Sequence, residues 1–335
     1  MARQTVVFKN KPKIISAFTI GGPKEGAGNF GKHIKEILQD DLFGETTFEK
    51  AECKMLSHAI RSAIDCSGVP EKDIDALLSG DLLNQIISAS FSARDYAFPY
   101  IGLYSACSTF TEALALSAVL TDGGYYKNVV SATGSHFAAA ERQYRYPLEL
   151  GSTRPPQSQW TVTGAGAAVV SSEGGARFPK IVSATFGKVM DYGVTDANNM
   201  GCAMAPAVFD TLVTLFKETN TEPIDYDLIL TGDLGALGSD VLKKLCLKKG
   251  YDIEKKHADC GEMIFNFDSE NYQGGSGAGC CAVVFNSLIY EKLCKKEIKK
   301  MIFAATGALL STLSTQQSES IPGVSHAVIL ECGND

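Results

Sequence analysis

The apolar positions of this chain form continuous runs that end in small residues, and the same arrangement occurs twice. The runs IDALLSGDLL (74–83) and YDLILTGDLG (226–235) both end in Gly-Asp followed by two further residues. Apolar runs without polar alternation predict strands that are covered on both faces. Helix-like stretches precede them, AECKMLSHAIRSAIDCSGV (51–69) before the first and MAPAVFDTLVTLFKETN (204–220) before the second. The two halves of the chain therefore share a helix–strand unit.

A second pair of elements follows in the same order. The runs YKNVVSATGSHFA (126–138) and IKKMIFAATGALLS (298–311) both pass through Ala-Thr-Gly. Before them lie SACSTFTEALALSAVL (105–120) and GGSGAGCCAVVFNSLIYEKL (274–293), which are apolar on nearly every side and predict helices buried all round. A last strand closes each half, GAGAAVVSS (164–172) in the first and HAVILEC (326–332) in the second.

Four paired elements in one order predict two similar halves, residues 1–177 and 178–335, that form one compact unit. Alternating strands and helices give mostly parallel sheets. Each half also contributes one fully buried helix, so we expect two sheets packed around two central helices. The predicted fold class is an α/β five-layer α-β-α-β-α sandwich.

Composition excludes several classes of protein. The net charge is −7 over 335 residues, and the dense basic run CKKEIKKM (294–301) reads as a short solvated loop, so a nucleic-acid partner is not expected. No apolar run near the start resembles a secretion signal, and none suggests a transmembrane segment. The ten cysteines are expected as free thiols in a reducing compartment. HADC (257–260) has the wrong spacing for a zinc site, so neither a metal nor a cofactor is predicted.

Motifs around one cysteine carry a family resemblance. Cys107 lies where the first buried helix begins, and ACSTFTEALALSA (106–118) resembles the A-C-x-x-F helix start of the ketoacyl synthase III type. TGAGAAVVSS (163–172) resembles the G-x-G-A-A strand of the same thiolase-like superfamily. Within that superfamily the chain resembles the stage V sporulation protein AD family, from KNKPKIISAFTIGGPKEGAGNFG (9–31) to SIPGVSHAVILE (320–331).

The resemblance implies a function that the residue pattern does not itself show. The family is implicated in moving dipicolinic acid, as its calcium chelate, into the developing spore. The implied partners are dipicolinic acid or calcium dipicolinate, a second copy of the chain in a homodimer, and other spore VA membrane proteins. The implied location is peripheral, at the cytoplasmic face of the forespore inner membrane.

Catalysis is not expected, because only part of the condensing machinery is present. Such enzymes combine a cysteine thiolate with a histidine and an asparagine, or a second histidine, from the second half. This chain has Thr231, Gly232 and Asp233 at the first of those positions, and QGGSGAGCC (273–281) and ATGALLS (305–311) at the others. We predict a binding protein on a degenerate enzyme fold. The alternative is an acyltransferase or thioesterase with Cys107 as nucleophile.

The candidate ligand-binding residues gather around the two Ala-Thr-Gly turns and one long loop. Each also has a structural interpretation: Cys107 as a small buried thiol, His136 as a hydrogen-bonded core histidine, Ser311 as a helix cap. Arg154 and Trp160 belong to the polar loop 144–164, which suits a planar aromatic carboxylate or else lies at the surface. The full set of candidates is Cys107, Ser108, Gly134, Ser135, His136, Arg154, Trp160, Gly307 and Ser311. Ala106, Gly134 and Gly307 are expected to leave room for a flat ring.

Overall fold

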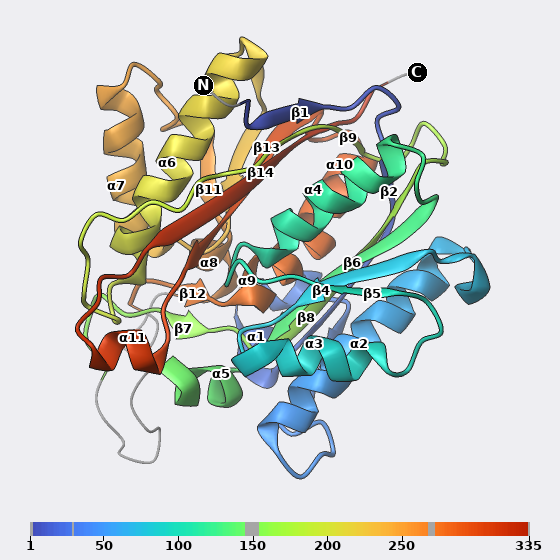
Figure 1. Ribbon diagram of the computed structural model, residues 1–335, viewed down its shortest axis with the longest axis horizontal. Coiled ribbons are helices and arrows are strands. Elements are labelled where there is room, and N and C mark those ends of the chain that lie inside the picture. The colour runs from blue at the N-terminus through green and yellow to red at the C-terminus, as the bar shows by residue number, and fades with distance from the viewer. Residues whose placement is uncertain (1–2, 29, 145–153, 267–271, 334–335) are drawn as a thin grey trace.

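A computed structural model describes residues 3–28, 30–144, 154–266 and 272–333 (Figure 1). Its main strands form two five-stranded halves with the same spatial order. The strands of the first half, in that order, are β2 (Lys13–Gly21), β8 (Gly164–Ser171), β6 (Asn128–Ser135), β4 (Ala76–Gly80) and β5 (Tyr100–Gly102). Those of the second half are β9 (Lys180–Thr185), β14 (Gly323–Glu331), β13 (Lys300–Ala308), β10 (Leu228–Thr231) and β11 (His257–Asp259). The repeated order confirms that the two halves are built alike.

The two sheets meet at their β2 and β9 edges. Lys13 and Lys180 are the one residue pair that joins β2 to β9 in the described chain, so the two sheets form a single hydrogen-bonded path. Strand β1 (Thr5–Val7) pairs antiparallel with Ser183–Thr185 of β9, although it precedes β2 in sequence. The first strand of the chain therefore belongs to the sheet of the second half.

Five layers result from the packing of the long helices. Helix α2 (Phe48–Ser67) covers the outer face of the first sheet, and α6 (Met200–Thr219) with α7 (Gly235–Lys248) covers that of the second. Helices α4 (Thr109–Asp122) and α9 (Ala278–Val284) lie between the sheets (Figure 1). The predicted five-layer sandwich is confirmed.

Shorter elements complete the described chain. The helices are α1 (Pro23–Ala27), α3 (Ile87–Ala93), α5 (Phe137–Tyr144), α8 (Cys260–Ile264), α10 (Tyr290–Cys294) and α11 (Thr312–Gln316). A π-helical turn, Phe285–Ile289, joins α9 to α10. The 3₁₀ turns are Gly31–His33, Glu71–Asp73, Asn84–Ile86 and Pro223–Asp225. The short strands are β3 (Glu36–Ile37), β7 (Trp160–Thr161) and β12 (Gly275–Ser276), of which β7 pairs with β12 across the two halves.

The main hydrophobic core is shared by both halves. Phe110 of α4, Phe285 of the π-helical turn and Phe303 of β13 are fully buried together, and the rings of Phe285 and Phe303 stack 4.7 Å apart. Truncating one buried phenylalanine to alanine in such a core typically costs about 3–5 kcal/mol of stability. Because each half supplies part of this cluster, the packing of one half depends on the other.

Helix α6 is apolar enough to raise the question of a membrane span. Within the described chain it is the one helix whose length and composition would allow it to cross a bilayer. Its most apolar window is 72% buried, packed against β13, β14 and α7. This burial is that of a core helix covering a sheet.

Candidate functional site

Cys107 lies in a strained turn between β5 and α4. Ala106 has a φ of +50°, in the left-handed region that residues with a Cβ atom seldom adopt. The turn holds Cys107 two residues before the first residue of α4, where the sequence predicted it. Backbone strain of this kind costs of the order of 1–3 kcal/mol and concentrates at functional sites.

The partner of Cys107 in the second half is a carboxyl group. Asp233, which follows β10, lies close enough to the Cys107 thiol for each group to affect the pKa of the other. Its Oδ1 accepts a hydrogen bond from Thr306 Oγ1 at 2.8 Å, and its Oδ2 accepts one from the backbone N–H of Gly277 at 3.1 Å. Residues from β10, β13 and the start of α9 thus hold Asp233 against the cysteine.

Burial determines the ionisation of this pair. Desolvation raises the pKa of Asp233 to about 7. Desolvation first, and then the neighbouring Asp233, raise the pKa of Cys107 well above that of an ordinary thiol. A thiolate is the nucleophilic form of cysteine, and it is stabilised by a helix N-terminus, a nearby cation or an imidazolium. Next to a carboxyl group the thiol of Cys107 keeps its proton at neutral pH.

A groove leads from the surface to Cys107. Its inner end is a cavity of about 30 Å³ beside Cys107, and its outer part has a volume of about 310 Å³. Leu82, Tyr104 and Leu310 line both parts, so the two spaces adjoin. The outer wall includes Gln85 and Ile86, whose φ values of +60° and +49° are again left-handed. For a β-branched residue such as isoleucine this conformation is a marked outlier.

Ser108 and Gly307 hold the two halves together at this turn. The Ser108 hydroxyl donates to the carbonyl of Ala305 at 3.0 Å and accepts from the N–H of His326 at 3.0 Å. A Cβ atom on Gly307 would lie 2.2 Å from the carbonyl oxygen of Ser105. The room that we expected beside Gly307 is therefore filled by backbone, and the glycine serves close packing.

Gly134, Ser135 and His136 follow one another at the end of β6. A Cβ atom on Gly134 would meet Ala165 of the neighbouring strand at 3.3 Å, so its space is filled as well. Ser135 Oγ donates to the carbonyl of Val162 at 2.7 Å and accepts from the N–H of Gly279 at 3.0 Å. Ser135 thus lies beneath the start of α9.

His136 uses both ring nitrogens within the protein. Its Nδ1 accepts from the N–H of Ala138 at 3.2 Å, so its Nε2–H donates to the carbonyl of Asp41 at 2.7 Å. Phe48 of α2 packs against the ring, and burial lowers the pKa of His136. Beyond its own turn, this neutral histidine contacts Phe48 of α2 and Asp41 of the preceding loop, on the outer side of the first sheet.

The remaining candidates lie in two places: one, Ser311, is at the outer groove, and the other two, Arg154 and Trp160, contact each other. Ser311 is the N-cap of α11 and also lines the outer groove, so both interpretations of this serine describe its position. Arg154 forms an ion pair with buried Glu141 and packs 4.4 Å from the ring centroid of Trp160. Residues 145–153 of the predicted loop lie outside the described part of the chain.

A series of hydrogen bonds that links α4 to β14 was not predicted from the sequence. Gly187 N–H donates to Nδ1 of His326 at 3.2 Å, so Nε2–H of His326 donates to Ser105 Oγ at 3.2 Å. Ser105 Oγ in turn donates to Glu112 of α4. In this direction the imidazole cannot take the serine proton, so the arrangement is not that of a nucleophilic serine. Asp233 was also missed as a site residue, although its place at the end of a buried strand was the available signal.

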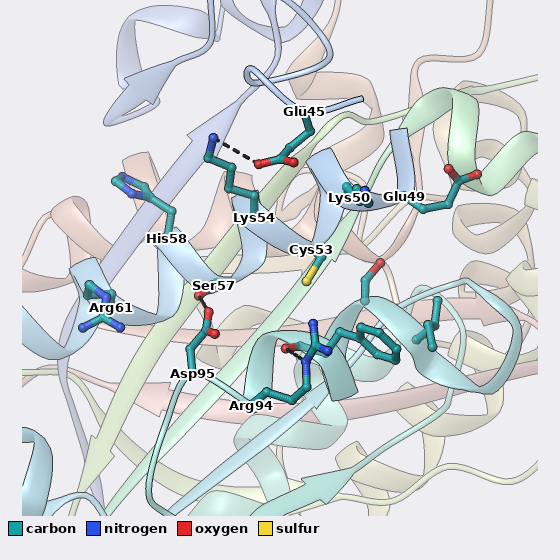
Figure 2. Close-up of a pocket in the computed structure, with 13 residues that line it drawn as sticks. Glu45, Glu49, Lys50, Cys53, Lys54, Ser57, His58, Arg61, Arg94 and Asp95 are labelled. Atoms are coloured by element: carbon teal, nitrogen blue, oxygen red, sulfur yellow. Dashed lines mark hydrogen bonds and ion pairs between the residues drawn. The ribbon is translucent and has the colours of Figure 1, made fainter. Parts of the chain in front are cut away.

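A larger cavity, of about 640 Å³, lies between α2 and α3 and does not include Cys107 (Figure 2). Some of its charged side chains already have partners within the lining. Lys54 lies 3.3 Å from Glu45, and Ser57 donates to Asp95 at 2.7 Å. We take the Cys107 groove as the candidate site despite its smaller volume, because it combines strained backbone with a buried thiol–carboxyl pair at the junction of the halves.

Two similar halves, with a cysteine at the start of the first buried helix, define a thiolase-like protein. Solved structures show the same fold. Human mitochondrial 3-ketoacyl-CoA thiolase in complex with CoA matches with a TM-score of 0.58 and 12% identity, over 99% of this chain and 100% of that one. The 3-oxoacyl-[acyl-carrier-protein] synthase III of Aquifex aeolicus VF5 matches with a TM-score of 0.54 and 14% identity, over 96% and 99%.

Sequence comparison identifies the family within this class. The model of the stage V sporulation protein AD (SpoVAD) family matches residues 2–331. Stage V sporulation protein AD of Bacillus subtilis (strain 168) is 42% identical over 329 residues, which cover 98% of this chain and 97% of that protein. The chain belongs to the stage V sporulation protein AD family, and its role is in sporulation.

Proposed function

We propose that this protein binds dipicolinate, as the free acid or its calcium chelate, in the groove that leads to Cys107, and that it transfers no acyl group. The ligand follows from the family resemblance. The observation that carries the absence of catalysis is the pairing of Cys107 with Asp233. A carboxyl group with a pKa near 7 neither stabilises a thiolate nor offers an oxyanion a positive charge.

The size and lining of the groove support the binding of a small flat molecule. The outer part, at about 310 Å³, falls at the lower end of the range for small-molecule sites, whereas the inner cavity admits little more than a water molecule. The ring would therefore lie in the outer groove, with one edge toward Cys107. None of the described residues that line either part is charged; the polar groups are those of Asn84, Gln85, Gln143, Tyr104 and Ser311.

An uncharged lining favours the calcium chelate over the free dianion. Burying an unpaired carboxylate is costly, because the protein must replace its hydration. In the chelate, Ca²⁺ balances the two carboxylates, and amide and hydroxyl oxygens are ligands that Ca²⁺ accepts. Calcium would then be bound as part of the ligand.

Isothermal titration with dipicolinate, with and without Ca²⁺, tests the proposal. Leu310→Trp should fill the junction of the inner and outer groove and abolish the heat of binding. Leu313→Trp, on the 65% exposed side chain of nearby α11, is the matched control and should bind normally. Cys107→Ala should weaken binding only moderately, because Cys107 lines only the inner end of the groove, beyond the edge of the ligand.

The alternative function, an acyltransferase or thioesterase with Cys107 as nucleophile, predicts other results. Cys107→Ala would then eliminate activity, and intact mass after incubation with acyl-CoA would show an acyl adduct on Cys107. Such an adduct, together with no heat from dipicolinate, would replace the binding proposal by the enzyme. Equal binding of dipicolinate and its positional isomers would also contradict a specific site.

A further inference from the structure

One end of the molecule is strongly basic although the chain as a whole is acidic. Three segments, residues 9–13, 177–180 and 292–300, hold ten lysines and arginines and one acidic residue, Glu297, against a net charge of −7 for the chain. We call these three segments the basic end. The sequence had suggested only that its longest run is a solvated loop.

Strand register brings these segments together. Lys13 of β2 lies opposite Lys180 of β9, Lys180 lies opposite Glu331 of β14, and Glu331 lies opposite Lys300 of β13. Four neighbouring strands therefore begin or end on the same side of the sheet, and the residues at these strand ends form a row of charges. The Glu331 carboxylate is 3.2 Å from Lys300 Nζ, so the acidic member of the row has a lysine partner. The row remains predominantly positive.

Other acidic groups beside the basic end are also engaged. Glu173 is 2.9 Å from Lys127, and Glu291 is 2.6 Å from Lys35. Asp227 accepts hydrogen bonds from the backbone of Lys299 and Lys300, at 2.8 and 3.1 Å. These contacts hold the acids at the base of the loops, whereas the side chains of Lys9, Lys11, Lys295 and Lys299 belong to exposed residues.

An exposed aromatic residue accompanies these lysines. The backbone N–H of Asn10 donates to Asp122 Oδ1 at 2.5 Å, which fixes the loop 9–13 to the end of α4. Tyr125 follows three residues later, after Gly123 and Gly124, and is 76% exposed. Tyrosine is enriched where proteins meet the headgroup region of a membrane, because its ring is apolar and its hydroxyl is polar.

We propose that the basic end binds the surface of a bilayer that contains anionic phospholipid. Each lysine near such a surface raises partition by roughly fivefold, and the attraction falls off within a Debye length. The cations are spread over three separate segments, which fits a flat anionic membrane surface better than the defined binding site of a protein partner. The rest of the chain is net negative, so the same surface repels it, and binding therefore orients the molecule.

The orientation has a definite geometry. Strand β13 runs from Lys300 in the basic end to Gly307 beside the Cys107 turn, a span of roughly 25 Å at about 3.3 Å per residue. Helix α4 spans the same two ends, from Ser108 to Asp122. Figure 1 shows the courses of β13 and α4. The candidate groove, at the Cys107 end of these elements, therefore faces the water when the basic end faces lipid.

Co-sedimentation with vesicles tests this surface. The protein should sediment with vesicles of phosphatidylglycerol and phosphatidylcholine in equal parts at low salt, but not with phosphatidylcholine alone. Lys295→Glu with Lys299→Glu should lower partition by roughly 25-fold or more. Lys50→Glu with Lys54→Glu, the same charge change on exposed residues of α2, is the control and should leave partition unchanged. Tyr125→Ser should lower the partition that remains at high salt.

Three results would overturn the proposal: equal sedimentation with both kinds of vesicle, an equal loss in the α2 control, or binding to polyglutamate without binding to vesicles. The last would assign the basic end to an acidic protein. Melting temperatures of the basic-end variants should match that of the unaltered protein, because the exchanged side chains are exposed. Lys295→Gln with Lys299→Gln should give a smaller loss than the glutamate pair, which a general folding defect would not produce.

Discussion

At the residue scale, Asp233 should make stability depend on pH. An aspartate in an unfolded chain has a pKa near 4, whereas burial raises the pKa of folded Asp233 to about 7. Between these values the folded chain binds more protons than the unfolded chain, so its stability falls as pH rises from about 4 to about 7. Asp233→Asn removes this loss. The stability of the variant relative to the unaltered protein should therefore rise across that range, by up to about 4 kcal/mol.

Urea unfolding at several pH values measures this difference. Comparison with the unaltered protein matters, because burial also raises the pKa of Asp259 and of Asp81, to about 6 in each case. Asp252→Asn, at an exposed aspartate, should run parallel to the unaltered protein at every pH. If the difference in free energy of unfolding between Asp233→Asn and the unaltered protein stayed constant from pH 4 to pH 8, the raised pKa of Asp233 would be contradicted.

The same residues show how far sequence reasoning reaches into the site. Cys107 could be placed from the strand-to-helix pattern, because turn and helix are local. Asp233 could be located at a strand end, but its role depends on burial between two halves that are distant in sequence. The direction of a side chain such as His136, which bonds to Asp41, is set by tertiary contacts that no local pattern records.

At the element scale, Ser108 should matter more than its size suggests. Its hydroxyl links the start of α4 to β13 and β14 through Ala305 and His326. Ser108→Ala leaves the buried N–H of His326 without this partner, although the carbonyl of Ala305 keeps its bond from Ser325 Oγ at 2.7 Å, and the loss should cost about 1–3 kcal/mol of stability. Chemical denaturation of Ser108→Ala and of the exposed control Ser172→Ala would measure it. A loss below about 0.5 kcal/mol for Ser108→Ala would mean that the N–H of His326 finds another partner.

The long elements were predictable and the short ones were not. All four paired elements are confirmed, because runs such as β6 and β13 are buried on both faces and cannot alternate in polarity. Strands β7 and β12 have two residues each and exist because they pair with each other across the halves. Helix α9 is apolar all round, yet sequence did not foresee the π-helical turn that follows it.

At the scale of the whole molecule, we expect a two-fold dimer through β5. Thiolase-like proteins pair through the strand before the nucleophile turn, and β5 ends the described sheet with β4 as its one strand partner. Unpaired strand edges readily join another chain. Sedimentation equilibrium at micromolar concentration should give twice the chain mass of 35.8 kDa. A single species at the chain mass would count against the dimer.

The pairing of β1 with β9 has a consequence for how the chain is made. Thr5, the first residue of β1, pairs with Thr185, so the strand at the start of the chain has no partner until the ribosome has added 180 more residues. At about 5–20 residues per second this takes roughly 10–35 s. For that time the amino-terminal segment must remain without its partner strand, and the two sheets can join at their shared edge only after more than half of the 335 residues have been added.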